Sequence, residues 1–404
     1  MKSGMALSDS AAPNAVEPLK AAADRAMARG DPRTAKDLFE RAVVLARDRL
    51  DIWLGLAACR RAVGDPEGAL AATQGALTVD PRCFPARLMK GSLLESMGLV
   101  AQADAAYGPA LLLAPPEDSL PEPMRRGLAR ARDVHDRRAA DLAASLRLEA
   151  ESAAERLPAA EAGRIDTFIE AMTGRRKIFH QEPVQHHYPG MPPVEFHDRA
   201  EFPWLADLEA RTDAIRAEVL AVWAEGSPDL EPYIDYADGV PLDQWAQLNR
   251  SLKWSAFHLI KGGALVEANC RRCPATMEAL ALVDQPKVPG RSPAAMFSIL
   301  RPRTRLPPHT GVANTRLVLH LPLIVPEGCG FRVGGETRQW REGQAWVFDD
   351  TIEHEAWNDS DLPRAILICD VWSPNLSPGE RDMIARLVSA HDRFNGGASV
   401  GGDL

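Results

Sequence analysis

TRLVLHLPLIV, residues 315–325, is the central one of five short runs rich in Val, Leu, Ile, Phe and Trp. The others are AAMFSIL (294–300), GFRVGG (330–335), QAWVFDD (344–350) and RAILICDVW (364–372). Pro, Gly and Asp residues separate these runs at intervals typical of an antiparallel sandwich or barrel. His309 and His354 lie within the same stretch, so we predict a small β-barrel with a metal at its mouth.

The central run alternates in a way that assigns its side chains to two faces. Successive side chains of a strand point to opposite faces, so Arg316, Val318 and His320 share one face and leucines occupy the other. The leucine face predicts apolar packing, and the other face carries a cation and an imidazole. Further along, Arg364 enters the last run, and an inward-facing Arg needs a carboxylate partner. That partner is either a dicarboxylate cosubstrate or a protein residue such as Asp349.

The two histidines suggest a known kind of iron site but do not complete it. Non-haem Fe(II) oxygenases bind iron with two His and one carboxylate, which leaves positions for a 2-oxo acid and O₂. Their usual sequence form is His-x-Asp or His-x-Glu followed by a distant His. Here Gly311 stands two residues after His309, so the carboxylate is missing and the spacing alone is a weak signal.

Four longer motifs make the resemblance specific. They are FSILRP (297–302), HTGVANTRLVLHLPL (309–323), FDDTIEHEAWND (348–359) and DVWSP (370–374). Together they resemble the aspartyl/asparaginyl β-hydroxylase family of 2-oxoglutarate-dependent oxygenases, over roughly residues 180–376. The resemblance implies a double-stranded β-helix, the jelly-roll or cupin-like fold, over residues 179–394. It also implies Fe(II), 2-oxoglutarate and O₂ as cofactor and cosubstrates.

The resemblance also implies a role for individual residues. His309 and His354 would be the only protein ligands of Fe(II), with water where a carboxylate at Gly311 would bind. Arg364 and Ser298 would hold the C5 carboxylate of 2-oxoglutarate, His320 would meet its C1 end, and Arg316 would lie near the substrate. One position departs from the animal enzymes, which have a second Arg where this chain has Val318.

The expected activity is hydroxylation of an amino-acid side chain, Asp- or Asn-like, free or within a peptide or protein. Two alternatives remain open. The position left empty by Gly311 could admit chloride and turn the reaction toward halogenation. Alternatively, the barrel is vestigial and the chain is a non-catalytic binding protein.

The N-terminal third repeats with a period of 34 residues. Gly-Asp-Pro at 30–32 recurs at 64–66, and Gly98 follows after the same interval. This is the period of tetratricopeptide helix pairs, which the stretch resembles over residues 16–121. An Ala-, Arg- and Glu-rich segment, residues 122–178, is predicted to form capping or bridging helices. Such arrays usually present a groove to a peptide or protein, although this one could only stabilise or dimerise the enzyme.

Composition excludes several other classes of protein. A formal net charge of −9 argues against binding nucleic acid through phosphate neutralisation. The sequence has no apolar signal segment and no run of 18 apolar residues, so we expect a cytoplasmic protein without a membrane partner. Six scattered cysteines do not suggest a disulfide framework. Residues 1–15 are predicted to be disordered and residues 395–404 to form a flexible tail.

Overall fold

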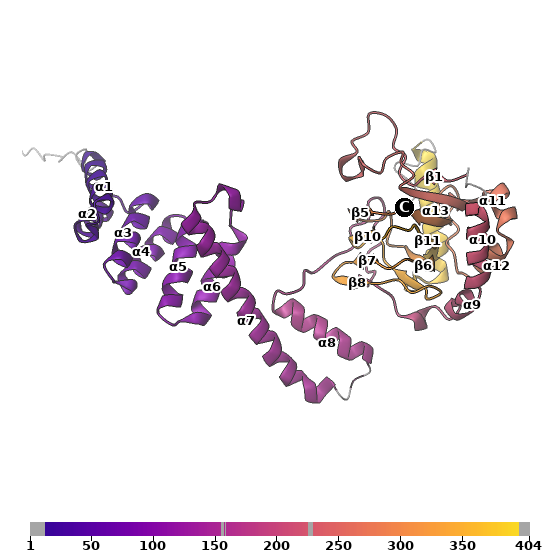
Figure 1. Ribbon diagram of the computed structural model, residues 1–404, viewed down its shortest axis with the longest axis horizontal. Coiled ribbons are helices and arrows are strands. Elements are labelled where there is room, and N and C mark those ends of the chain that lie inside the picture. Colours follow the sequence, from indigo (N-terminus) through magenta and orange to yellow (C-terminus); the bar gives the residue numbers. More distant parts are fainter. Residues whose placement is uncertain (1–12, 155–156, 158, 225–228, 396–404) are drawn as a thin grey trace, which may run out of the picture. The chain divides into compact units, whose positions relative to one another are not determined.

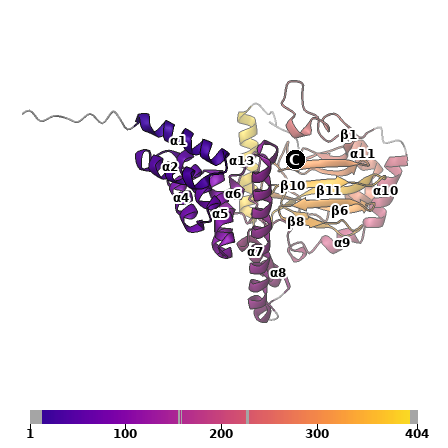
Figure 2. The ribbon, with the colours of Figure 1, turned by 60° about the vertical axis from the view of Figure 1, so that its left-hand side comes forward.

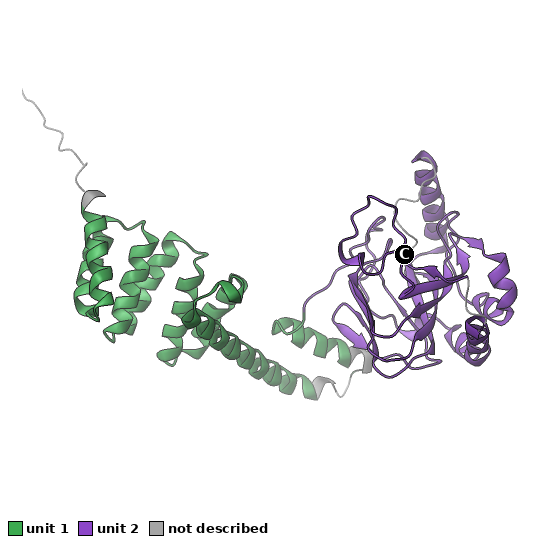
Figure 3. Cartoon of the chain, turned by 45° about the horizontal axis from the view of Figure 1, so that its top comes forward, with its two compact units in different colours: residues 1–176 green, residues 177–404 purple. Residues whose placement is uncertain are grey.

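The computed structural model describes residues 13–154, 157, 159–224 and 229–395. The chain divides into two compact units, residues 1–176 and 177–404 (Figure 3). Our predictions for residues 1–12 and 396–404 lie outside the described residues. The first helix already begins at Pro13, three residues earlier than the sequence suggested. No helix in the described ranges is long and apolar enough to cross a membrane.

Unit 1 begins with three antiparallel helix pairs (Figure 1). The six helices are α1 (Pro13–Ala28), α2 (Pro32–Leu45), α3 (Leu50–Ala62), α4 (Pro66–Val79), α5 (Phe84–Ser96) and α6 (Val100–Leu112). Each recurring glycine ends the first helix of a pair in the left-handed conformation that glycine adopts without strain. In the first two pairs an Asp side chain then caps the next helix, accepting a hydrogen bond from Thr34 N or Gly68 N. The predicted tetratricopeptide-like repeat is confirmed.

The helices of unit 1 are held together by aromatic rings that lie on glycines. A Cβ added at each of these glycines would come within 2.5 Å of the ring, so only glycine permits this approach. The pairs are Phe39 on Gly55, Trp53 on Gly75 and Tyr107 on Gly91. The repeats are followed by η1 (Glu117–Ser119), by α7 (Glu122–Ala154), which packs on α5 and α6, and by α8 (Ala159–Met172), which packs on α7 (Figure 2).

Unit 2 is built on two antiparallel sheets. The strands are β1 (Glu231–Pro232), β2 (Trp254–Lys261), β3 (Ala264–Leu265), β4 (Ala295–Leu300), β5 (Thr304–His309), β6 (Arg316–Ile324), β7 (Cys329–Val333), β8 (Glu336–Arg338), β9 (Trp346–Phe348), β10 (His354–Asn358) and β11 (Arg364–Trp372). The larger sheet has the order β1-β2-β4-β11-β6-β9, with β3 beside β2, and the smaller one has the order β5-β10-β7-β8. Of strands β4 to β11, four lie in the larger sheet (β4, β6, β9, β11) and four in the smaller one (β5, β7, β8, β10), as in a jelly roll. The predicted fold class is confirmed.

The larger sheet has an apolar cluster on each face. On the outer face Leu317, Leu319 and Leu321 pack with helical residues, and on the inner face Val318 packs with the smaller sheet. The alternation predicted for this strand is therefore confirmed. The helices of unit 2 are η2 (Arg199–Glu201), α9 (Leu205–Glu209), α10 (Thr212–Ala224), η3 (Asp243–Trp245), α11 (Glu267–Arg272), α12 (Pro274–Leu280) and α13 (Pro378–Phe394).

Two of the strands that lie outside the predicted runs, β5 and β10, carry the two histidines. β5 contains Pro307 and Pro308, which lack the N–H that a central strand needs. It can nevertheless form because it is the edge strand of the smaller sheet. β10 pairs with β5 in a register that places His354 opposite His309.

Candidate active site

The rings of His309 and His354 lie side by side, and each ring turns its Nδ1 atom toward a backbone carbonyl oxygen. Their ring centroids are 4.1 Å apart. His309 Nδ1 lies 2.7 Å from the carbonyl oxygen of Pro307, and His354 Nδ1 lies 3.1 Å from that of Ile352. A neutral imidazole that donates Nδ1–H to a carbonyl leaves the lone pair of Nε2 free for a metal.

Burial keeps both imidazoles in the form that binds metals. It lowers the pKa of His354 to about 4. It also lowers the pKa of His309 well below the ordinary value, and the neighbouring His354 acts in the same direction. Because a metal ligand must be deprotonated, both rings are ready to bind at neutral pH.

Residue 311 has no carboxylate, but the carboxylate of Asp350 occupies the space beside it. A Cβ on Gly311 would lie 1.9 Å from Asp350 Oδ2 and 2.2 Å from Asp350 Cγ. Asp350 is the second residue after β9 and is 3% exposed. Its Oδ2 lies 3.0 Å from Arg316 Nη1, while its Oδ1 has no hydrogen-bond partner in the described part of the chain. The site therefore contains a carboxylate beside residue 311 that comes from a different strand end.

Asp349 and Asp350, which are adjacent in the turn before His354, differ in what they contact. Asp349 does brace that turn, since its Oδ1 accepts hydrogen bonds from Thr351 N at 2.9 Å and Thr351 Oγ1 at 2.6 Å. Asp350 instead pairs with Arg316, and this contact was missed. The sequence shows only two adjacent acids before His354, which does not reveal that they point to different partners.

Arg364 is a fully buried cation without a protein carboxylate. It is 1% exposed, and no carboxylate of the described residues lies within ion-pair distance. Its Nε has no hydrogen-bond partner there, and its guanidinium lies 4.9 Å from the ring centroid of Trp340. Burial lowers the pKa of Arg364 to about 10. An unpaired buried charge is costly, so this geometry favours an anionic ligand over a structural ion pair.

Ser298 and His320 lie in the same cavity as Arg364. Ser298 Oγ accepts a hydrogen bond from Trp254 Nε1 at 3.1 Å. His320 is 6% exposed, and its Nδ1 has no partner in the described residues. Burial and then the charge of Arg364 keep its pKa well below the ordinary value. The cavity also contains His309, Gly311, Val318, Phe331, Phe348, Asp350, His354, Ile366 and Ile368.

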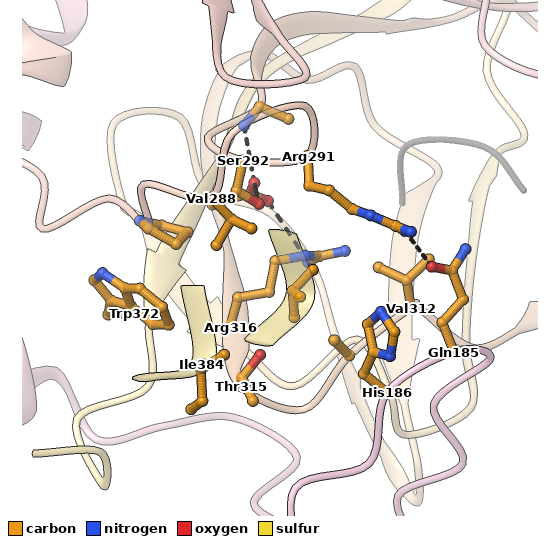
Figure 4. A pocket seen from close by; sticks show the side chains of 15 residues that line it. Gln185, His186, Val288, Arg291, Ser292, Val312, Thr315, Arg316, Trp372 and Ile384 are labelled. Atoms are coloured by element: carbon orange, nitrogen blue, oxygen red, sulfur yellow. Dashed lines mark hydrogen bonds and ion pairs between the residues drawn. The ribbon is translucent and has the colours of Figure 1, made fainter. Parts of the chain in front are cut away.

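Arg316 lies in a second cavity rather than in this one. That cavity is also lined by Arg291, Trp372 and Ile384, and Figure 4 shows Arg316 inside it. Arg316 is 6% exposed, and its Nη1 lies 3.6 Å from Asp370 Oδ1 in addition to Asp350. The predicted substrate cation is therefore already matched by two carboxylates, whereas Val318 and His320 face the first cavity.

Residues 209–374 match the family model described as aspartyl/asparaginyl beta-hydroxylase. This part of the chain belongs to that family. The ornithine lipid ester-linked acyl 2-hydroxylase of Rhizobium tropici is 40% identical over 192 residues, 47% of this chain and 63% of the relative. The aspartyl/asparaginyl beta-hydroxylase of Homo sapiens is 39% identical over 176 residues, 43% of this chain and 22% of the relative. The chain thus spans less than two thirds of the length of either relative.

Among solved structures, the TPR domain of Sgt2 from Aspergillus fumigatus is similar to the helical unit. It is 24% identical, covers 36% of this chain and 87% of its own, and has a TM-score of 0.27.

Membership of this family implies iron and 2-oxoglutarate, and the residues of the cavity fit both. Among the described residues no three His, Cys, Asp or Glu side chains are grouped as a metal site. Two imidazoles with free Nε2 atoms are present, however, beside a residue too small to supply a third ligand. The unpaired guanidinium of Arg364 in the same cavity suits a dicarboxylate.

Proposed function

We propose that unit 2 is an Fe(II)- and 2-oxoglutarate-dependent hydroxylase that acts on an amino-acid side chain, free or within a peptide or protein. The observation that carries this proposal is the buried, unpaired Arg364 in one cavity with the His309–His354 pair. Bound iron and 2-oxoglutarate would supply the oxidising chemistry, in which O₂ and 2-oxoglutarate yield succinate, CO₂ and a C–H converted to C–OH.

The residues of the chain would provide the binding and the orientation. His309 and His354 hold the metal through Nε2, and Arg364 with Ser298 holds the distal carboxylate of 2-oxoglutarate. Apolar side chains of the inner cluster surround these groups and exclude water, which strengthens each charged contact. His320 faces the same cavity and can donate or accept a hydrogen bond at the other end of the cosubstrate.

The carboxylate of Asp350 bears on the halogenation alternative. It fills the space beside Gly311 where chloride would have to bind. A carboxylate repels chloride, so the site disfavours halogenation. Comparing product masses with and without chloride tests this point.

A second candidate substrate is an acyl chain. The Rhizobium tropici relative carries an acyl 2-hydroxylase name, and Val318 presents an apolar surface to the cavity. Among the described residues that line this cavity, Arg364 is the only Lys or Arg. No further cation is therefore placed there for the carboxylate of an Asp substrate.

The helical unit has a groove of its own that could recruit a substrate. Its lining includes Leu70, Gln74, Arg87, Lys90 and Leu94 from α4 and α5. We propose that it binds a peptide segment of the substrate or of a partner protein. Replacing both Arg87 and Lys90 by Ala should then weaken capture of that protein without changing 2-oxoglutarate binding.

The hydroxylase proposal is tested by anaerobic titration of the full chain with Fe(II) and then 2-oxoglutarate. We expect a visible metal-to-ligand charge-transfer band and slow release of succinate in air. Arg364→Ala should lose both signals. The matched control is Arg338→Ala, since Arg338 also lies over an aromatic ring, 3.9 Å from that of Phe196, but outside the cavity. A folded protein that binds Fe(II) but not 2-oxoglutarate would contradict the proposal.

A further inference from the structure

A large groove leads from the cavity of the two histidines to the surface of unit 2. The groove and the cavity share Tyr233, Trp254 and His309, so they are continuous. The groove has a volume of about 620 Å³ and is lined mainly by residues within 233–245, together with residues from 182–185 and 308–312. Any substrate that reaches His309 from this side must lie in it.

The charged residues that line the groove are all acidic. They are Glu182, Asp235, Asp243 and Glu353, and no Lys or Arg is among the described lining residues. Glu182 and Asp243 are exposed and make no ion pair with another described residue. The groove therefore carries two carboxylates whose charge is not compensated by the protein.

The other two acids, Asp235 and Glu353, belong to clusters of ion pairs whose net charge is negative. Arg250 lies 2.9 Å from Asp235 and 2.7 Å from Asp238, so one cation meets two carboxylates. Arg332 likewise pairs with Glu353, at 2.9 Å, and with Glu355. One further cation, Lys177, lies 3.9 Å from Glu353. Six carboxylates and three cations at this rim leave a net charge of about −3, which attracts a cation. Three basic residues, Lys253, Arg303 and Arg305, do not line the groove but line a neighbouring depression that shares Asp243 and Gln244 with it.

The wall of the groove next to His309 is aromatic. Tyr233 stacks on Trp254 with ring centroids 3.6 Å apart. The ring centroids of Trp245 and His309 are 5.0 Å apart, and the two rings are nearly perpendicular. The segment that carries these rings is fixed by Arg250 N, which donates to Ile234 O at 2.8 Å. Aromatic faces attract ammonium and guanidinium groups, so the wall and the carboxylates favour the same kind of ligand.

The inner end of the groove offers a further acceptor. Asp350 lines the cavity, is 3% exposed, and its Oδ1 has no hydrogen-bond partner in the described residues. A buried carboxylate oxygen without a donor is costly, so a donor from outside the chain fits there.

We propose that the substrate of this site carries an ammonium or guanidinium group that lies in the acidic groove while a neighbouring carbon faces His309 and His354. This rests on the proposed hydroxylase function and specifies its substrate class as cationic, such as a Lys- or Arg-containing peptide segment. An acidic segment would instead meet only carboxylates among the described charged residues that line the groove.

The test measures binding without turnover. Two fluorescein-labelled, amidated peptides share a central Asn, which three Lys on each side flank in one peptide and three Glu in the other. Fluorescence polarisation reports their affinity for the full chain, loaded anaerobically with Fe(II) and N-oxalylglycine. We expect the Lys peptide to bind at least about tenfold more tightly than the Glu peptide, as two or more charge pairs would produce.

Paired variants separate the groove from the general charge of the protein. Glu182→Gln with Asp243→Asn should weaken Lys-peptide binding about tenfold. The control is Asp207→Asn with Asp382→Asn, which removes the same charge from α9 and α13 and should leave the affinity unchanged. Equal binding of both peptides, no effect of the groove variant, or an equal effect of the control would overturn the proposal. Binding of 2-oxoglutarate to the same proteins, measured separately, shows whether the hydroxylase function itself has failed.

Discussion

Replacing Gly311 by Asp would give the chain the usual His-x-Asp motif. We expect this substitution to destabilise the fold rather than to add a third metal ligand. The new Cβ would lie 1.9 Å from Asp350 Oδ2, and rotation of the new side chain does not move its own Cβ out of this clash. Asp350 would have to move and would lose its contact with Arg316, 3.0 Å away. Breaking a buried ion pair costs about 3–5 kcal/mol. For a domain of this size, that lowers Tm by about 6–20 °C.

A second substitution, Asp350→Gly, should restore part of the stability that Gly311→Asp removes. In Gly311→Asp with Asp350→Gly, the carboxylate moves from the segment after β9 to the segment after β5 but stays in the same region of the cavity. We expect the double variant to recover at least about half of the lost stability, because the steric conflict and the repulsion between two acids are both gone. Asp350→Gly alone completes the double-mutant cycle, and the coupling should be at least about 2 kcal/mol.

Calorimetry and urea unfolding give the stabilities, and anaerobic Fe(II) titration gives the metal affinity. The contrary result is that Gly311→Asp alone is as stable as the parent and binds Fe(II) more tightly. That result would mean that Asp350 does not hold the space beside residue 311 in solution.

Three further predictions concern other parts of the chain. Arg364→Leu should leave the metal-free protein as stable or more stable, because an unpaired buried cation is removed, while the Kd for 2-oxoglutarate by calorimetric titration rises at least about 100-fold. Burial lowers the pKa of His258 from 6.5 to about 4. The unfolded chain therefore takes up a proton first, and stability falls as pH drops from about 6.5 to 4. At pH 5 His258 should account for about 2 kcal/mol of the loss, so urea unfolding of His258→Gln should show a smaller difference between pH 7.5 and pH 5; an unchanged difference would contradict the assignment. Gly91→Ala, whose Cβ would lie 2.3 Å from the ring of Tyr107, should destabilise unit 1 by about 1–3 kcal/mol and leave 2-oxoglutarate binding unchanged.

The helical repeats were predictable from sequence because their signals are local. A glycine in the left-handed conformation, an Asp that caps the next helix and a Pro in its first turn occupy consecutive positions. The alternation of β6 was predictable for a similar reason, since two-residue periodicity follows from strand geometry alone. Features that depend on neighbouring residues in the chain can be recognised without knowing the fold.

β5 shows where this kind of inference ends. Its segment TRLPPH has two prolines and little apolar character, so by composition it indicates a loop. It is a strand because it lies at the edge of the smaller sheet, where β10 supplies all its pairing on one side. Edge position is a property of the complete sheet, so it cannot be predicted from the six residues of β5 alone.

The partners of buried charges were the least predictable feature, and they bear most directly on function. An inward-facing Arg364 required a carboxylate, and the sequence allowed either Asp349 or a cosubstrate. The fold excludes Asp349, which is engaged by Thr351 and by Gln181 Nε2 at 2.5 Å and forms no ion pair with Arg364 in the described residues. Arg316 shows the opposite case, since two acids already surround a cation that looked free for a substrate. A buried charge thus points to an external ligand only when every protein group that could pair with it is accounted for, and Arg364 meets that condition where Arg316 does not.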